Sequence, residues 1–231
     1  MEGRPLHFHL AGINNQNFIM RDEETGSWWQ QVSGEAILGP LKGSHLELVP
    51  NDELSFGLWM SENPQGRVLR PDESVAAAGR YAPSDWEERI GRMVVVTKPT
   101  DQRLEPRAII VGVSFNGRAK AYPLSALQKQ SPIIDIVGEV PFLLVIGEDK
   151  KSVRGFETTV DGRMLEFFTK SGASLLQLVD AETGSEWDFT GRATSGPLAG
   201  KQLRRTPVLS DYWFDWKTYH PDSDVYQPGE P

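Results

Sequence analysis

Two histidines near the N-terminus have a spacing that suits metal binding. His7 and His9 are two residues apart in the segment LHFHLA. Residues two apart in a β-strand point to the same face, so both rings could ligate one metal ion. The alternative is a pair of polar side chains on a solvated strand face, because no third ligand is evident nearby. His7 and His9 are therefore candidate metal ligands.

Adjacent tryptophans supply a candidate ligand contact. An exposed indole ring can stack on a sugar or another flat ligand. Strand alternation directs one ring of Trp28-Trp29 inward and the other outward. In the internal repeat described below, Trp29 aligns with Trp187 and Trp28 aligns with Glu186. Trp29 is thus predicted to be a core residue, and Trp28 is the candidate ligand-binding residue.

Motifs for catalysis are absent from the sequence. It contains no G-x-S-x-G elbow, Walker loop, dinucleotide fingerprint or H-E-x-x-H pair. It also contains no cysteine, which excludes disulfides, thiol nucleophiles and thiolate metal sites. A pair of carboxylates that only the fold brings together stays open. No catalytic residue and no cofactor is therefore predicted.

Composition restricts the partners of the chain. The formal net charge is -8, and no dense block of Lys and Arg is present, so nucleic acid is not an expected partner. No apolar run approaches the roughly 18 residues of a membrane span. The N-terminus lacks the basic start and apolar run of a signal peptide. The 22 Gly and 16 Pro residues imply many turns, which are typical of short strands.

An internal repeat is the strongest pattern in the chain. The stretch from Asp22 to Gly43, DEETGSWWQQVSGEAILGPLKG, resembles the stretch from Asp180 to Gly200, DAETGSEWDFTGRATSGPLAG. Gly39 matches Gly196 at an offset of 196 − 39 = 157, and this offset also pairs Trp59 with Trp216. Large rings at equivalent places are most simply packing residues, so the matched tryptophans Trp29, Trp187, Trp59 and Trp216 are all predicted to lie in the core. We interpret the repeat as an internal duplication.

The repeat predicts the organisation of the chain. Met1 aligns near Val160, so residues 1–70 form a truncated first repeat unit. Residues 71–104 are a connecting segment, and residues 105–231 are a complete second unit. The expected fold is mainly β (α+β), with two pseudo-equivalent β-rich units and short helices.

Strands and one short helix in each unit are predicted within this scheme, and the helix of the first unit is expected within residues 51–63, before Pro64. Asn116-Gly117 lies between two apolar runs and is a strong hairpin signal. Ser210 is the expected N-cap of a helix that ends before Pro221. A strand at 93–97 is expected to cover the open edge of the first unit. The remaining strands are predicted at 107–115, 118–122, 132–136, 140–146, 163–169, 174–179 and 186–189.

A series of motifs resembles the bacterial domain of unknown function 3179. These motifs are IIVGVSFNGRAKAYPL, IIDIVGEVP, DGRMLEFFTKSG, DAETGSEW, GPLAGKQL and DWKTYHPDSDVY, in this order. The resemblance covers residues 3–70 and about 105–226. It implies an extracytoplasmic or membrane-associated bacterial protein. It also implies a C-P-x-C-type pair, with redox or metal chemistry, just after strand 140–146. Gly147 and Lys150 occupy those positions here, so thiol-dependent activity is not expected.

Three functional classes follow from these observations. The favoured one is a non-catalytic binding or accessory domain, whose partner is an unknown protein or small-molecule ligand. The alternative is an enzyme, either a carboxylate-dependent hydrolase or a cysteine-less relative of a redox-active domain. The third is a purely structural domain of a larger assembly. A cleft with convergent polar groups and shifted pKa values would favour the enzyme, and an apolar patch around Trp28 would favour binding.

Overall fold

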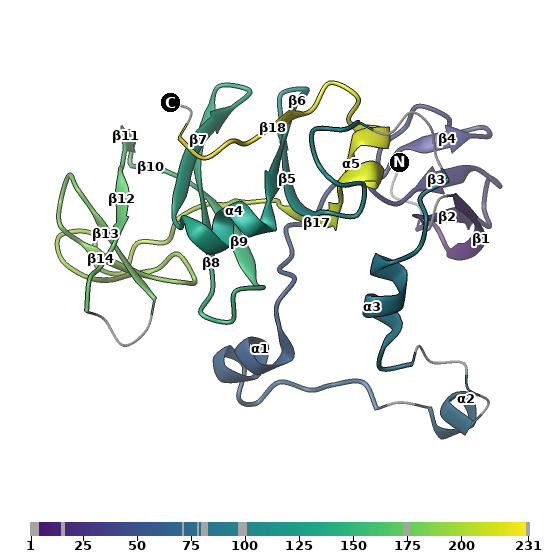
Figure 1. Ribbon diagram of the computed structural model, residues 1–231, viewed down its shortest axis with the longest axis horizontal. Helices are drawn as coiled ribbons and strands as arrows, with labels where there is room; N and C mark the ends of the chain where they lie inside the picture. The colour runs from purple at the N-terminus through teal and green to yellow at the C-terminus, as the bar shows by residue number, and fades with distance from the viewer. Residues whose placement is uncertain are drawn as a thin grey trace.

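The computed structural model describes residues 5–14, 17–70, 72–77, 79, 83–96, 101–172 and 176–229. These residues form short, mostly antiparallel strands and five short helices (Figure 1). The prediction of a mainly β fold is confirmed.

Two four-stranded sheets lie at opposite ends of the molecule (Figure 1). The first sheet has the order β1-β2-β3-β4, and the second sheet has the order β12-β13-β14-β15. The strands of the first sheet are β1 (Phe8–Asn14), β2 (Asn17–Asp22), β3 (Trp28–Gln30) and β4 (Ala36–Leu38). The strands of the second sheet are β12 (Phe167–Thr169), β13 (Gln177–Asp180), β14 (Glu186–Asp188) and β15 (Ala193–Ser195).

Two further sheets fill the space between these ends. One has the order β17-β5-β6-β18, and the other has the order β16-β9-β8-β7. A separate pair joins β10 (Thr159–Val160) to β11 (Arg163–Met164). The strands of the central sheets are β5 (Ile109–Phe115), β6 (Arg118–Pro123), β7 (Ile133–Val137), β8 (Val140–Ile146), β9 (Val153–Glu157), β16 (Arg205–Thr206), β17 (Leu209–Tyr212) and β18 (Asp224–Val225).

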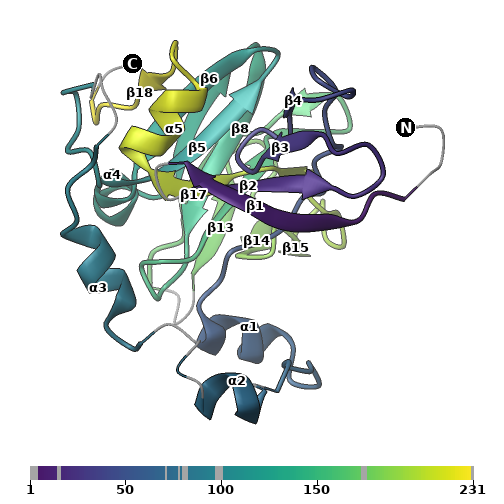
Figure 2. The same cartoon turned by 90° about the vertical axis from the view of Figure 1, so that its right-hand side faces the viewer.

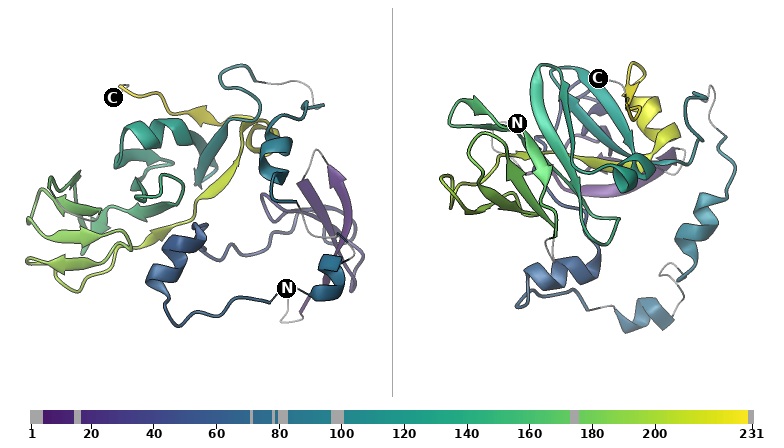
Figure 3. Two further views of the ribbon diagram at one scale, coloured as in Figure 1. Left: turned by 60° about the horizontal axis from the view of Figure 1, so that its bottom comes forward. Right: turned by 60° about the vertical axis from the view of Figure 1, so that its left-hand side comes forward.

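The helices fall into two groups. Helices α1 (Phe56–Glu62), α2 (Glu73–Ala77) and α3 (Trp86–Gly91) lie on an arm of chain outside the sheets (Figure 3). Helices α4 (Leu124–Lys129) and α5 (Trp213–Tyr219) pack on the central strands. Helices α1, α2 and α3 carry no residue described as buried, whereas α5 buries four.

The central hairpins follow local turn signals. Phe115 pairs with Arg118 across the predicted Asn116-Gly117 turn, and both turn residues have positive φ, at 48° and 75°. Such a turn matches the right-handed twist of the strands that it joins. Val137 pairs with Val140 across a second two-residue turn. Both hairpins were predicted from the sequence and are confirmed.

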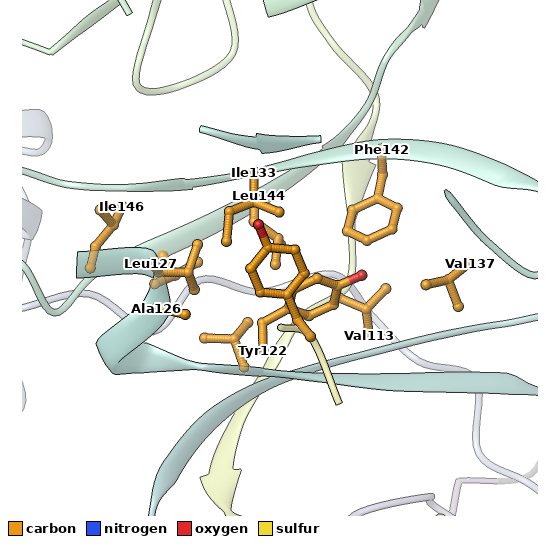
Figure 4. Packing of buried hydrophobic residues seen from close by; sticks show 12 residues of the cluster. Val113, Tyr122, Ala126, Leu127, Ile133, Val137, Phe142, Leu144 and Ile146 are labelled. Atoms are coloured by element: carbon orange, nitrogen blue, oxygen red, sulfur yellow. The ribbon is translucent and has the colours of Figure 1, made fainter. Parts of the chain in front are cut away.

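Apolar side chains form three core clusters. The largest lies between the two central sheets and α4, and Figure 4 shows its packing around the buried Tyr122 ring. A second cluster joins Leu143, Val145 and Phe156 of β8 and β9 to the second sheet. A third surrounds Trp213 and Trp216 of α5.

The two end sheets repeat one another in detail. In each, an aspartate carboxylate accepts hydrogen bonds from the Thr N–H three residues later and from the Trp indole seven residues later. The indole N–H distances are 2.8 Å for Trp29 to Asp22 and 2.9 Å for Trp187 to Asp180. The third and fourth strands of each sheet also share a register shift at the same place. The correspondence supports our interpretation of a duplication.

A glycine makes the same close approach in both sheets. Gly39 has φ of +100°, and a Cβ there would lie 2.7 Å from Ser27 Cα. Gly196 has φ of +85°, and a Cβ there would lie 2.6 Å from Ser185 Cα. Only glycine combines a left-handed conformation with so short a contact. The repeated Gly-Pro-Leu motif is thus explained by backbone geometry.

Several predicted boundaries are wrong. Residues 163–169 form two separate strands, β11 and β12. Ser210 lies within β17, where it pairs with Val111, and α5 begins only at Trp213. Residues 94–96 form no strand, and Val94 is 83% exposed, so this part of the chain does not cover the first sheet; residue 97 lies outside the described residues. Residues 174 and 175 of the predicted strand 174–179 also lie outside them.

The predicted core tryptophans fall into two classes. Trp29, Trp187 and Trp216 are buried, with exposures of 0%, 0% and 2%. Trp59 is only half-buried, contrary to the prediction. Trp216 packs so closely over β5 that a Cβ on Gly112 would lie 2.3 Å from its ring. The Trp59 ring instead lines a cavity beside α1, which leaves it partly exposed.

Candidate functional site: a charged cavity beside helix α1

A cluster of ion pairs joins α1 to β9. The Arg154 side chain on β9 is only 3% exposed. Its Nε donates to Asp52 Oδ2 at 2.9 Å, and its two terminal nitrogens donate to the two Glu62 carboxylate oxygens at 2.7 Å each. Arg205, at the start of β16, forms a second ion pair with Asp52. Two guanidinium groups and two carboxylates therefore balance one another.

Local structure fixes these charged groups in place. The Ser55 hydroxyl caps α1, and the Ser55 N–H donates to Ser152 Oγ at 2.9 Å. Leu54 and Leu58 pack on the second core cluster. The Arg154 guanidinium carbon lies 4.7 Å from the centre of the Phe189 ring, which shields one face of the ion pair. Ion pairs thus hold α1 against β9, and apolar contacts hold it against the second core cluster.

The ion pairs determine the protonation of the site. Burial acts to raise the pKa of Asp52, but hydrogen bonds from Arg154 and Arg205 outweigh it and hold that pKa below its usual value. Burial acts to lower the pKa of Arg154, and the bonds to Glu62 and Asp52 outweigh it in the same way. Both groups therefore stay charged over the whole physiological pH range.

A cavity of about 470 Å³ opens beside this cluster. The Trp59 ring forms an aromatic part of its wall, and Asn63 and Thr190 add an amide and a hydroxyl group. This combination offers a flat apolar surface, hydrogen-bonding groups and no net charge. The full lining is Asp52, Leu54, Trp59, Glu62, Asn63, Arg154, Thr190 and Arg205.

A second polar cluster lies where the first sheet contacts α5. Asn17 Nδ2 on β2 donates to Asp215 Oδ2 at 2.5 Å. Burial, with the neighbouring Asp215 charge, raises the pKa of Asp211 to about 8, and burial raises the pKa of Asp215 to about 6. The two carboxyls titrate as a pair that keeps a proton near neutral pH. Neither of them lines the cavity beside α1.

The histidines predicted as metal ligands lie on the surface and face separate glutamates. His7 Nδ1 lies 2.5 Å from Glu24 Oε1, and this hydrogen bond raises the pKa of His7. His9 Nδ1 lies 3.9 Å from Glu23 Oε1. Within the described residues, no three His, Cys, Asp or Glu side chains are grouped to hold a metal ion. Metal binding by His7 and His9 stays a prediction.

Trp28, the predicted ligand contact, is half-buried on β3. It pairs with Leu38 on one side and Arg21 on the other. It is at the end of the molecule that carries the first sheet, away from α1 (Figure 1). The register places His9, Arg21 and Trp28 in one row across β1, β2 and β3, so Trp28 shares a face of the first sheet with His9. Trp28 does not line the charged cavity, and its ligand role also stays a prediction.

Comparison with known proteins identifies the family. A family model described as a protein of unknown function (DUF3179) matches residues 2–223. The chain belongs to the DUF3179 family. No curated protein matches this DUF3179 chain, and no solved structure matches it. None of the helices described for it is long and apolar enough to cross a membrane.

The positions expected for a cysteine pair form a tight turn in this DUF3179 protein. The Lys150 N–H donates to the Gly147 carbonyl at 2.9 Å, in the turn between β8 and β9. Both residues line a smaller cavity of about 170 Å³. The turn brings the two positions together, but Gly147 has no side chain and Lys150 carries an ammonium group in place of a thiol.

Sequence analysis missed the charged cavity because its parts are far apart in the chain. Arg154 lies 102 residues from Asp52 and 92 residues from Glu62. One usable signal was present for the carboxylate pair. At the repeat offset, Asp211 and Asp215 align with Leu54 and Leu58, so an apolar pair in one copy is acidic in the other.

Proposed function

We propose that this DUF3179 protein is a non-catalytic binding domain whose ligand is a small, uncharged, hydroxyl-rich molecule of the saccharide class. The site is the cavity beside α1. The observation that carries the proposal is the balance of charge on its lining, where two arginines and two carboxylates are paired. A ligand with a net charge would upset this balance of charge. Hydroxyl groups are uncharged, and they can donate hydrogen bonds to the carboxylates and accept them from the guanidinium groups.

The shape of the lining supports the same ligand class. The half-buried Trp59 ring offers an apolar face on which the C–H side of a sugar ring can stack. Arg154, Asp52 and Glu62 are held rigidly by one another, so ordering them costs little when a ligand binds. A volume of about 470 Å³ falls in the range of small-molecule pockets.

Binding is favoured over catalysis because of how the charged groups are used. The carboxylates of Asp52 and Glu62 are ion-paired with arginine. A general acid needs a raised pKa, but that of Asp52 is lowered. The raised pKa values of Asp211 and Asp215 are the observation in favour of the alternative, a carboxylate-dependent hydrolase. That pair contacts Asn17 of the first sheet and does not face the cavity.

Calorimetric titration of the purified chain tests the proposal. The probes are glucose, galactose, N-acetylglucosamine and cellobiose at millimolar concentration. At least one should bind, and Trp59→Ala should abolish the heat of binding. The matched control is Trp86→Ala, because Trp86 is 47% exposed on α3 and does not line the cavity. Circular dichroism confirms that both variants are folded.

Three results would contradict the proposal. Failure of all four saccharides to bind would exclude the ligand class tested. Equal binding by the wild type and Trp59→Ala would place the ligand elsewhere. Release of glucose from cellobiose would show a hydrolase and would direct attention to Asp211→Asn.

A further inference from the structure

The first sheet has one apolar face that is exposed, which we call the open face. Residues directly opposite one another in a sheet share a face. Leu10 pairs with Met20, and Met20 pairs with Trp29, so these three lie together. Phe8, opposite Asp22, and Ile13, opposite Phe18, complete the set. The open face therefore consists of Phe8, Leu10, Ile13, Phe18 and Met20 around the buried Trp29.

In the second sheet, the equivalent apolar face is covered by other strands of the chain. Phe167 in the second sheet contacts Trp187 edge-to-face at 5.7 Å, just as Phe8 contacts Trp29 at 5.8 Å. Phe167 is only 2% exposed, because β8 and β9 pack on that face. Phe8 is 37% exposed at the equivalent position. The same face is thus covered by a second sheet in one case and is open in the other.

The exposure extends well beyond Phe8. Leu10, Ile13 and Phe18 are 58%, 63% and 48% exposed. Contiguous apolar side chains of this kind are typical of an interaction surface. Figure 2 views the molecule from this end and shows β1 and β2 in front of the other strands. The open face carries no charged side chain apart from Asp22, which is buried.

We propose that the open face is a homodimer interface, in which the first sheets of two copies of this chain pack face to face. The second sheet indicates the kind of cover that such a face takes, because its own cover is an apolar sheet face made of Leu143, Val145 and Phe156. A second copy supplies an apolar sheet face of the same kind. Packing about a two-fold axis makes the contact self-complementary, and it closes at two subunits.

Charge gives the dimer a distinctive salt dependence. Each chain carries a formal net charge of -8, so two chains repel one another at long range. The contact itself is apolar and is not weakened by screening. Added salt should therefore strengthen association, whereas an interface made of ion pairs would weaken.

Sedimentation velocity over a concentration series tests the proposal on the full chain. The wild type should form a dimer, and the dissociation constant should fall between 50 mM and 500 mM NaCl. Leu10→Glu should raise it by about tenfold or more, because it would bury an unpaired charge. Leu10→Lys should do the same, although it makes the chain less acidic.

A matched control lies on the other face of the same sheet. Leu38 pairs with Trp28, which pairs with Arg21, so it points away from the open face. It is 57% exposed, against 58% for Leu10. Leu38→Glu should leave the dimer intact. Because both leucines are exposed, neither change should unfold the chain, and circular dichroism verifies this.

Other outcomes would overturn the proposal. A wild-type chain that stays monomeric up to the highest concentration, in both salts, would show that the open face does not bind its own kind. Dissociation by Leu38→Glu to the same extent as by Leu10→Glu would place the interface on another face. A dimer that weakens as salt is added would indicate ion pairing in place of apolar contact.

Discussion

The Asp211–Asp215 pair makes a sharp prediction about stability and pH. Asp211 lies on β17 opposite Ile110, and Asp215 lies in the first turn of α5. Burial is the largest cause of both raised pKa values. The negative charge of Glu53 raises the pKa of Asp211 further. The perturbation is Asp211→Asn, which keeps the shape of the side chain and cannot ionise.

The sign of the effect follows from proton binding. An aspartate in the unfolded chain has a pKa near 3.8, whereas the pKa of Asp211 in the folded chain is raised to about 8. Between these values the folded state binds more protons than the unfolded state. The stability of the wild type must therefore fall as the pH rises through this window.

The magnitude depends on the number of protons held. One retained proton changes the free energy of unfolding by about 1.4 kcal/mol for each pH unit. From pH 5 to pH 7 the pair should thus cost the wild type roughly 3 kcal/mol relative to Asp211→Asn. At pH 8 the variant should be the more stable protein, because the amide at position 211 cannot acquire a buried charge.

Urea unfolding of both proteins at pH 5, 6, 7 and 8 measures this difference. Comparing the two proteins removes the contribution of His220, whose pKa is lowered by burial and which acts in the opposite direction. Asp222→Asn is the control, since Asp222 is exposed. If the wild type and Asp211→Asn change in parallel from pH 5 to pH 7, the carboxyl pair does not retain a proton and the reasoning fails.

Three further predictions concern packing, charge and backbone. Trp187→Ala should cost about 3–5 kcal/mol in urea unfolding, because the ring is fully buried, and exposed Trp86→Ala should cost little. Arg154→Ala should cost about 3 kcal/mol, because it removes the cation of Glu62 and one of the two cations of Asp52; Arg204→Ala, which removes a 79% exposed side chain, should cost under about 1 kcal/mol. Gly196→Ala should raise the rate or extent of thermal unfolding more than Gly200→Ala, because both have positive φ but only Gly196 faces a contact at 2.6 Å. Equal losses for the two members of any pair would contradict the corresponding explanation.

Local signals account for the elements that could be predicted. The β5–β6 turn needs two residues with positive φ, and Asn116-Gly117 supplies them. The start of α5 could not be found in this way. Ser210 has the chemistry of a helix cap, but residues 209–212 pair with β5, about a hundred residues earlier in the chain. Helix α4 was missed because its N-cap, Pro123, makes no side-chain hydrogen bond and gives no start signal.

The residues of the candidate site were harder to predict from the sequence than the fold was. Ion pairs form wherever the fold brings opposite charges together, and Arg154 gives no sign in the sequence of its partners on α1. Its position within an apolar strand was the only local hint, because a buried guanidinium needs a carboxylate partner. For His7, His9 and Trp28, the sequence predicted metal or ligand binding. The structure places the two histidines on the surface and Trp28 at a half-buried position.

Comparison of the two repeats separates the residues that build the same local structure in both from the residues that differ between them. The matched residues, such as Asp22 with Trp29 and Asp180 with Trp187, build the same turn twice. The unmatched ones contact the rest of the protein. Leu54 and Leu58 anchor α1 beside the charged cavity, whereas of their acidic counterparts Asp215 contacts the first sheet and Asp211 lies opposite Ile110 of β5.

We therefore expect the functional residues at positions where the two repeats differ in residue type or in exposure. The matched side chains of the two sheets, Asp22 with Asp180 and Trp29 with Trp187, are buried structural groups. Trp59 matches the buried Trp216 in type but is itself half-buried and lines the cavity, so this position differs between the repeats in exposure. Arg154 and Thr190 of the cavity come from the second half of the chain, and Trp59 and Glu62 come from α1. A ligand in this cavity would therefore contact both copies at once. If it binds as proposed, it should also slow the separation of α1 from β9, which hydrogen exchange at residues 55–62 would detect.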